Sequence, residues 1–277
     1  MRDIQKVAIL DLYNGMANLG MKNIQEILTR YSKNSDTELQ YDIFDVRQKE
    51  EVPNIDNYDI YISTGGPGSP FEGEGKVWEK NYFSWLDKVY NFNQKNNDSK
   101  KHAFFICHSF QMISRFFEIG NVCKRKSLSF GIFPMHHTEL GWNEPFFSEL
   151  PEPFYAVDNR YWQLIEPNHA KLKSLGAEIL SIEKERPHVD LERAVMAIRF
   201  SPEMFAVQFH PEADPIGMET YFNDPKKKIE IIESHGQQKY DEMCDFVNDE
   251  DKIILTQKVI IPNFLQNAIN SKQLQMA

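Results

Sequence analysis

The sequence contains few cysteines, which limits the kinds of site that it can build. Only three are present among 277 residues, Cys107, Cys123 and Cys244, and they lie far apart in the chain. Three scattered thiols cannot form a disulfide framework or a thiolate metal site, so we expect no metal centre. Cysteine usage of this kind indicates a reducing, cytoplasmic location.

Long hydrophobic runs and an excess of positive charge are also missing. No apolar stretch approaches the roughly 20 residues that span a membrane, and residues 1–6 do not resemble the start of a signal peptide. Lysine and arginine number 31 against 41 aspartates and glutamates, which gives a net charge of −10. Because binding to phosphate groups needs a basic surface, we expect neither a nucleic acid nor a membrane as a partner.

The first half of the chain alternates between strand and helix patterns. Apolar runs predict strands at residues 7–12, 41–46 and 58–63, and the second should lie nearer an edge because its polar and apolar residues alternate. Helical periodicity appears at residues 16–31 and 78–92. This order predicts an α/β fold, in which a three-layer, mostly parallel sheet carries helices on both faces. Such sheets bind ligands beyond the carboxyl ends of their strands.

The second half follows a different pattern. Short strands and turns are expected between residues 131 and 209, and a charged, helical composition begins near residue 226. Pro262 should kink or divide the final helical segment. We therefore predict a main domain over residues 1–222 and a C-terminal helical extension over residues 223–277 that packs on it.

Cys107 occupies a distinctive position, because a short apolar run at residues 103–106 ends on it and a helical pattern starts at once. A strand that turns directly into a helix lifts the residue at the turn onto the edge of the sheet, where helix N–H groups can activate a thiol. This placement suits a nucleophile. Taken alone, however, Cys107 is better explained as a buried, inert thiol, since most free cysteines are buried.

Two further segments carry side chains or backbone suited to chemistry. Residues 64–70, Thr-Gly-Gly-Pro-Gly-Ser-Pro, form the most turn-rich stretch, in which glycines allow N–H groups to approach a ligand closely. A late apolar strand ends in His210-Pro211-Glu212. Each has a simpler explanation, an ordinary surface loop for the first and a structural hydrogen bond for the second.

Taken together, the three segments resemble the class I (triad-type) glutamine amidotransferases. The matching motifs are Gly65-Gly66-Pro67-Gly68-Ser69, Cys107 with Gln111, and Phe209-His210-Pro211-Glu212, in the same order and at similar spacing over about residues 5–220. The stretches at residues 13–20 and 139–142 resemble the GMP-synthase-like branch of stand-alone domains.

This resemblance implies a flavodoxin-like fold, no cofactor, and a glutaminase that hydrolyses the side-chain amide through a glutamyl thioester. Cys107 would attack, His210 would transfer the proton, and Glu212 would orient the imidazole. The backbone N–H groups of Gly66 and His108 would form the oxyanion hole. Gln111 and Gly65 would line the pocket for glutamine or a γ-glutamyl substrate. The ammonia would pass to a separate ammonia-accepting synthase.

Two residues depart from the family pattern, in which the turn commonly reads Gly-x-Cys-x-Gly-x-Gln. Phe105 and Ser109 stand where those glycines are expected. Serine is tolerated if the backbone avoids angles reserved for glycine. A phenyl ring must instead point into space left by smaller neighbours, or the turn is displaced.

Three alternatives remain open. In the PfpI-type hydrolases and chaperones a Cys-His pair occupies the same turn, so Cys107 and His108 would act together while His210 and Glu212 would be structural. The same triad could also hydrolyse a γ-glutamyl peptide, because thioester chemistry does not depend on what leaves. Finally, the domain could bind glutamine or a partner with weak turnover or none.

Overall fold

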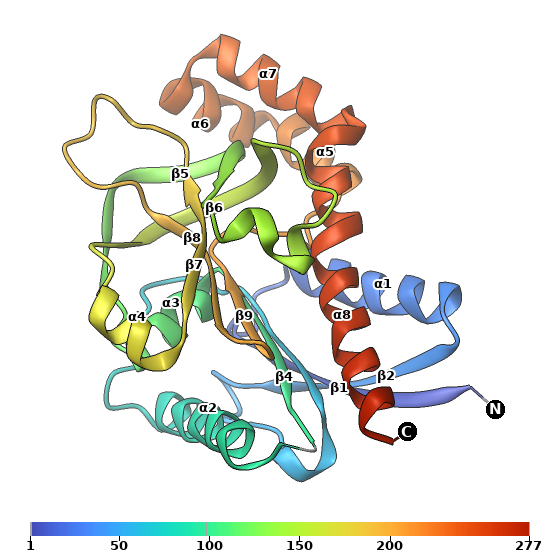
Figure 1. The fold of residues 1–277 in the computed structure, drawn as a ribbon. Coiled ribbons are helices and arrows are strands. Elements are labelled where there is room, and N and C mark those ends of the chain that lie inside the picture. Colours follow the sequence, from blue (N-terminus) through green and yellow to red (C-terminus); the bar gives the residue numbers. More distant parts are fainter. Residues whose placement is uncertain (1, 98, 277) are drawn as a thin grey trace.

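The computed structural model describes residues 2–97 and 99–276, which form one nine-stranded sheet flanked by helices (Figure 1). The sheet has the order β2-β1-β3-β4-β9-β8-β7-β5-β6. Its strands are β1 (Asp3–Asp11), β2 (Thr37–Asp45), β3 (Ile60–Ser63), β4 (His102–Ile106), β5 (Asn121–His137), β6 (Phe154–Ile165), β7 (Glu178–Glu183), β8 (Val195–Ser201) and β9 (Met204–Val207). The α-helices are α1 (Leu19–Asn34), α2 (Val77–Lys95), α3 (His108–Phe116), α4 (His169–Leu175), α5 (Pro215–Asn223), α6 (Pro225–His235), α7 (Gln237–Asn248) and α8 (Leu255–Met276).

The predicted α/β architecture is confirmed. Strands β2, β1, β3, β4 and β9 pair in parallel, and β2 is the edge strand that its alternating sequence predicts. The remaining strands extend the sheet with antiparallel pairs. None of the helices in the described ranges is long and apolar enough to cross a membrane.

The parallel strands separate two apolar cores, because alternate side chains of a strand face opposite sides of the sheet. In β4, Phe104 and Ile106 join the core beneath α1 and α8, whereas Phe105 joins the core beneath α2 and α3. Figure 1 shows these two pairs of helices on opposite sides of the parallel strands. The three-layer arrangement therefore follows from strands that are apolar on both faces.

One expectation about the second half is wrong. Short strands were expected from residue 131, but β5 begins at Asn121 and continues for 17 residues. It pairs with β6 on either side of an irregularity between Lys124 and Ser129. The polar residues around this irregularity hide the strand pattern, because they interrupt the alternation from which strands are predicted.

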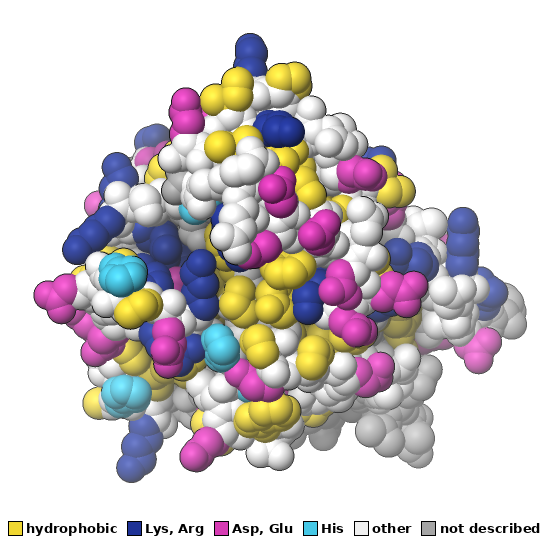
Figure 2. Space-filling model, turned by 90° about the horizontal axis from the view of Figure 1, so that it is seen from above, with side chains coloured by type: hydrophobic (Ala, Val, Ile, Leu, Met, Phe, Trp, Pro, Cys, Tyr) yellow, Lys and Arg dark blue, Asp and Glu magenta, His cyan; other side chains and the backbone are white. Residues whose placement is uncertain are grey.

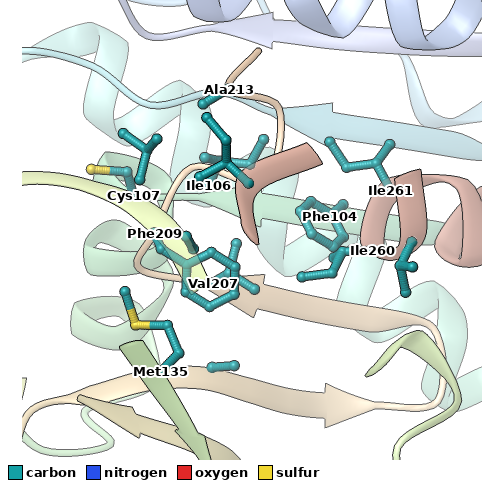
Figure 3. Packing of buried hydrophobic residues seen from close by; sticks show 14 of the residues in the cluster. Phe104, Ile106, Cys107, Met135, Val207, Phe209, Ala213, Ile260 and Ile261 are labelled. Carbon is teal, nitrogen blue, oxygen red and sulfur yellow. The ribbon is translucent and has the colours of Figure 1, made fainter. Parts of the chain in front are cut away.

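The C-terminal helix α8 is built into the main core. The ring of Phe264 lies 5.2 Å from that of Phe104, and Ile260 and Ile261 are fully buried beside it (Figure 3). At the far end of the helix, Lys272 Nζ lies 2.6 Å from Asp59 Oδ2. The extension thus packs on the sheet as predicted, while a domain boundary at residue 222 stays a prediction.

Pro262 does not divide the last segment, contrary to the sequence-based expectation. Helix α8 runs on through Pro262, and the chain instead breaks its helical course at Lys252, with φ −106° and ψ −123°. A proline cannot donate a hydrogen bond to the carbonyl four residues earlier, here that of Lys258. Lys258 is exposed, so water can hydrate this carbonyl and the helix tolerates the missing bond.

Replacing Phe264 with alanine is expected to lower the free energy of unfolding by about 3–5 kcal/mol, because the change leaves a cavity between α8 and the sheet. Urea denaturation measures this loss. Asn267→Ala, at an exposed position of the same helix, is the matched control and should change stability little. A loss below about 1 kcal/mol for Phe264→Ala would show that α8 contributes little to the cooperative core.

Candidate active site

Three neighbouring parallel strands deliver the motif residues to one edge of the sheet. Strand β4 lies between β3 and β9. Gly65 and Gly66 follow β3, Cys107 follows β4, and His210 comes three residues after β9. Because the carboxyl ends of parallel strands meet at the same edge, segments more than 100 residues apart in the sequence come together there.

Cys107 forms a strained turn between β4 and α3. Its backbone has φ +49° and ψ −96°, a left-handed conformation that is uncommon for a residue with a side chain. Its N–H donates to Val207 O in β9 at 2.8 Å, which fixes the turn. The side chain is 4% exposed, and Figure 3 shows the sulfur turned away from the packed apolar side chains. This geometry presents the thiol beside the unpaired N–H groups at the start of α3.

The structure explains how Phe105 is accommodated. Its side chain points into the core on the α2 side and its ring lies 6.2 Å from that of Trp85. On the two flanking strands its neighbours in register are Ser63 and Ala206, both small. The ring therefore fills space that small residues leave, and the turn at Cys107 keeps its place at the end of β4.

Ser109 replaces the second expected glycine with a hydrogen-bonding side chain. Its Oγ accepts from the N–H of Ile106 at 2.7 Å and donates to the carbonyl of Ser63 at 2.7 Å. The backbone of Ser109 is helical, and the residue is completely buried. The hydroxyl thus ties the end of β3 to the turn that holds Cys107.

Ser109→Ala is expected to lower the free energy of unfolding by about 1–3 kcal/mol, because it leaves a buried N–H and a buried carbonyl without their partner. Chemical denaturation of both proteins measures the difference. Ser174→Ala is the control, since Ser174 is exposed and its hydroxyl bonds only to the nearby Lys171 carbonyl. Equal stability of Ser109→Ala and wild type would contradict a structural role for this hydroxyl.

His210 and Glu212 form a buried pair next to the thiol. His210 Nδ1 lies 2.7 Å from Glu212 Oε1, and the Glu212 side chain is 1% exposed. Burial lowers the pKa of His210, but the negative charges of Glu212 and Cys107, and hydrogen bonds to both, outweigh burial and raise the pKa well above 6.5. With Nδ1 turned to Glu212, the other ring nitrogen is left for the Cys107 thiol.

The glycine-rich turn packs against this pair. A Cβ atom placed on Gly65 would lie 3.0 Å from His210 Cε1 and 3.6 Å from the Cys107 Cβ, so only glycine leaves the imidazole its full space. A Cβ on Gly66 would collide with the carbonyl oxygen of Leu12. Both glycines are therefore required by close approach.

A cavity of about 340 Å³ opens over the thiol. Four of the residues predicted from the sequence line it, namely Gly66, Cys107, Gln111 and His210. Gln111 also donates to Gln208 Oε1 at 3.2 Å, and Gln208 Nε2 lies 3.6 Å from Cys107 Sγ. A chain of amides thus connects the floor of the cavity with the sulfur.

The structure adds residues that the sequence analysis missed. Tyr13, which follows β1, lines the cavity and is 9% exposed. Burial, followed by the charges of Glu212 and Cys107, raises the pKa of Tyr13 well above 10, so its hydroxyl stays protonated. Its position immediately after a buried parallel strand is the signal that could have identified it.

Arg160 is a second residue found only in the structure. It lines the same cavity, but its guanidinium lies 2.9 Å from Asp158 and 2.9 Å from Glu183. Burial lowers the pKa of Arg160, and the two carboxylates outweigh this and raise it. Arg160 therefore remains charged beside the thiol, although its hydrogen bonds already serve the two acids.

His108 does not share the cavity through its side chain. The imidazole is 1% exposed, and burial, together with Arg47 and Arg115, lowers its pKa to about 3. The residue is absent from the described lining of the thiol cavity. A neutral ring in this position does not favour a Cys107–His108 pair, whereas the backbone N–H of His108 lies at the helix start, where the oxyanion role is predicted.

Comparison with known proteins gives the following matches. The family model for class I glutamine amidotransferases matches residues 20–227. No curated protein matches the sequence. A glutamine amidotransferase from Thermotoga maritima has a TM-score of 0.66 at 15% identity, over 96% of this chain and 98% of its own.

Two further solved structures are similar. A protein from Thermoplasma acidophilum that is assigned to GMP synthase has a TM-score of 0.55 at 16% identity, over 99% of this chain and 98% of its own. The glutaminase domain of Trypanosoma brucei CTPS, with bound acivicin, has a TM-score of 0.53 at 15% identity, over 75% of this chain and 86% of its own.

At these identities the solved structures show a shared fold alone. The family model, in contrast, covers more than half of the chain and includes the segments that carry Gly66, Cys107 and His210. The chain therefore belongs to the class I glutamine amidotransferase family.

Proposed function

We propose that this protein hydrolyses the side-chain amide of glutamine and releases ammonia for a separate acceptor protein. The observation that carries the proposal is the strained turn at Cys107 beside the buried His210–Glu212 pair. A thiol, an imidazole and a carboxylate in this order are the parts of a nucleophilic triad.

Each group has a defined role in the proposed reaction. Cys107 attacks the amide carbon and forms a glutamyl thioester, while His210 takes the thiol proton and passes it to the leaving nitrogen. Glu212 holds the imidazole in one tautomer and stabilises its charged form. The N–H groups of Gly66 and His108 stabilise the negative charge on the amide oxygen. Water then hydrolyses the thioester.

The substrate would bind in the cavity over the thiol, which Gln111 lines. Gly65 keeps this region open, because a side chain there would press on His210. A synthase would be the acceptor, in line with the GMP-synthase-like branch predicted from residues 13–20 and 139–142. We place the protein in the cytoplasm, since its three cysteines are free.

The test is to incubate the purified protein with glutamine and to measure released glutamate for wild type and for His210→Ala. We expect glutamate release by wild type and a loss of at least about 10³-fold in the variant, because no other described group is placed to take the thiol proton. Activity that survives His210→Ala would overturn the triad. Absence of turnover, together with no labelling of Cys107 by a glutamine-like electrophile, would indicate a binding domain.

A further inference from the structure

A second cavity lies beside the thiol cavity and has a volume of about 450 Å³. The two share Tyr13, residues 16–18, Asn159 and His210. Cys107 lines only the first, and Glu212 lines only the second. The His210 imidazole therefore borders both cavities, with the nucleophile on one side.

Apolar side chains from several elements form most of the wall of this second cavity. They come from α1, β5, β6 and α5, which the tertiary structure brings together around His210. These side chains are Leu19, Phe130, Val157, Ala213, Met218 and Tyr221. No lysine or arginine is among the described residues that line it.

The charged groups in and near this cavity are already paired. Glu212 is bonded to His210, and Asp214 Oδ1 accepts from the N–H of Gly217 at 2.8 Å as the N-cap of α5. Lys227 lies over the outer ring of Tyr221 at 5.5 Å, but its ammonium is 2.8 Å from Glu230. The cavity thus offers no free cation for a carboxylate and no free carboxylate for an ammonium group, so it favours an uncharged apolar group.

We propose that the second cavity receives the leaving group of an N-substituted glutamine amide, and that the preferred leaving group is an uncharged, apolar amine. This inference rests on the proposed function, because His210 must deliver a proton to the leaving nitrogen. A nitrogen next to His210 can carry its substituent into the cavity that His210 borders on the side away from Cys107. Ammonia itself would leave the apolar wall without contacts.

The reaction balances with water alone. In the first step the amide C–N bond breaks, a C–S bond forms at Cys107, and the thiol proton passes through His210 to the amine. In the second step water breaks the C–S bond, gives its proton through His210 to the sulfur and yields glutamate. The products are glutamate and the free amine, and no oxidant or cofactor is consumed.

A substrate series tests this specificity. The γ-glutamyl ethyl-, butyl- and benzylamides are compared with glutamine, with γ-glutamyl-leucine, which adds a carboxylate, and with the mono-γ-glutamyl amide of 1,4-diaminobutane, which adds an ammonium group. We expect kcat/KM to rise about fourfold for each buried methylene from ethyl- to butylamide. The two charged analogues should fall at least about tenfold below the butylamide.

The outcomes separate this inference from the proposed function. Turnover of glutamine at a kcat/KM equal to or above that of the butylamide, or a preference for either charged analogue, would overturn the leaving-group assignment and keep the glutaminase. Absence of turnover for every amide would overturn the proposed function and this inference with it.

Bulky substitutions in the cavity provide a second test. Met218→Trp fills the cavity from α5, and Leu19→Trp fills it from α1 at a position that is 46% exposed and so tolerates a larger side chain. Both should lower the ratio of benzylamide to glutamine kcat/KM by about tenfold or more. Ile216→Trp, 77% exposed on α5 and outside the described lining, is the matched control and should keep the ratio. An unchanged ratio in both cavity variants would contradict the inference.

Discussion

Cys107→Ala is expected to lower kcat for glutamine hydrolysis by at least about 10⁴-fold, because it removes the only described thiol that lines the cavity. What remains would come from binding and from the backbone N–H groups, which cannot form a thioester. Glutamate release under single-turnover conditions measures the residual rate.

The substitution removes a single sulfur atom, so the fold should survive it. Cys107 adopts a left-handed φ, and alanine does not differ from cysteine in this backbone preference. Cys123→Ala is the matched control, since Cys123 lies in β5 and does not line the cavity. Residual activity above about one hundredth of wild type would exclude Cys107 as the nucleophile.

Glu212→Gln is expected to lower kcat by about 10³- to 10⁴-fold with little change in KM, because a neutral amide can hold His210 in the wrong tautomer and does not stabilise its charged form. The carboxylate raises the pKa of His210, so its removal should also move the His210 limb of the pH–rate profile to lower pH. A variant with the wild-type pH profile would contradict the pairing.

The same pair makes stability depend on pH. The pKa of His210 is raised in the folded state, so the stabilisation it provides is fully present below the unfolded value of about 6.5 and is lost as pH rises through the folded value. The difference in unfolding free energy between wild type and Glu212→Gln should therefore be largest near pH 6 and shrink in alkaline solution. Urea denaturation across this range measures it.

The surface agrees with the charge balance read from the sequence. Acidic and basic side chains are interspersed around hydrophobic ones on the face shown in Figure 2, and no large basic field covers it. The absence of a partner for nucleic acid stays a prediction from the net charge of −10.

The parallel half of the fold could be predicted because its signals are local. Buried parallel strands appear as continuous apolar runs, so the ends of β1, β3 and β4 could be placed from the sequence. The antiparallel half was harder, because β5 carries a polar irregularity between Lys124 and Ser129. A segment of that kind resembles a loop until its partner strand is known.

The candidate site divides in the same way. Gly66, Cys107 and His210 could be proposed from the sequence, because each follows a strand and parallel strands end at one edge. Tyr13, Gln208 and Arg160 could not, because only the folded chain brings them to the thiol. Phe105 and Ser109 seemed to conflict with the family pattern until the structure showed small neighbours around one and hydrogen bonds to the other.

The sequence by itself determined the parallel core, the turn that holds Cys107 and the residue types of a triad, because these depend on periodicity and on neighbours along the chain. Only the tertiary structure decided what surrounds them. Gln257 at the start of α8 donates to the carbonyl of Glu212 at 3.2 Å, and side chains of α1, β5 and α5 enclose the second cavity. Such contacts join segments that are distant in the sequence, and no local pattern records which of them will meet.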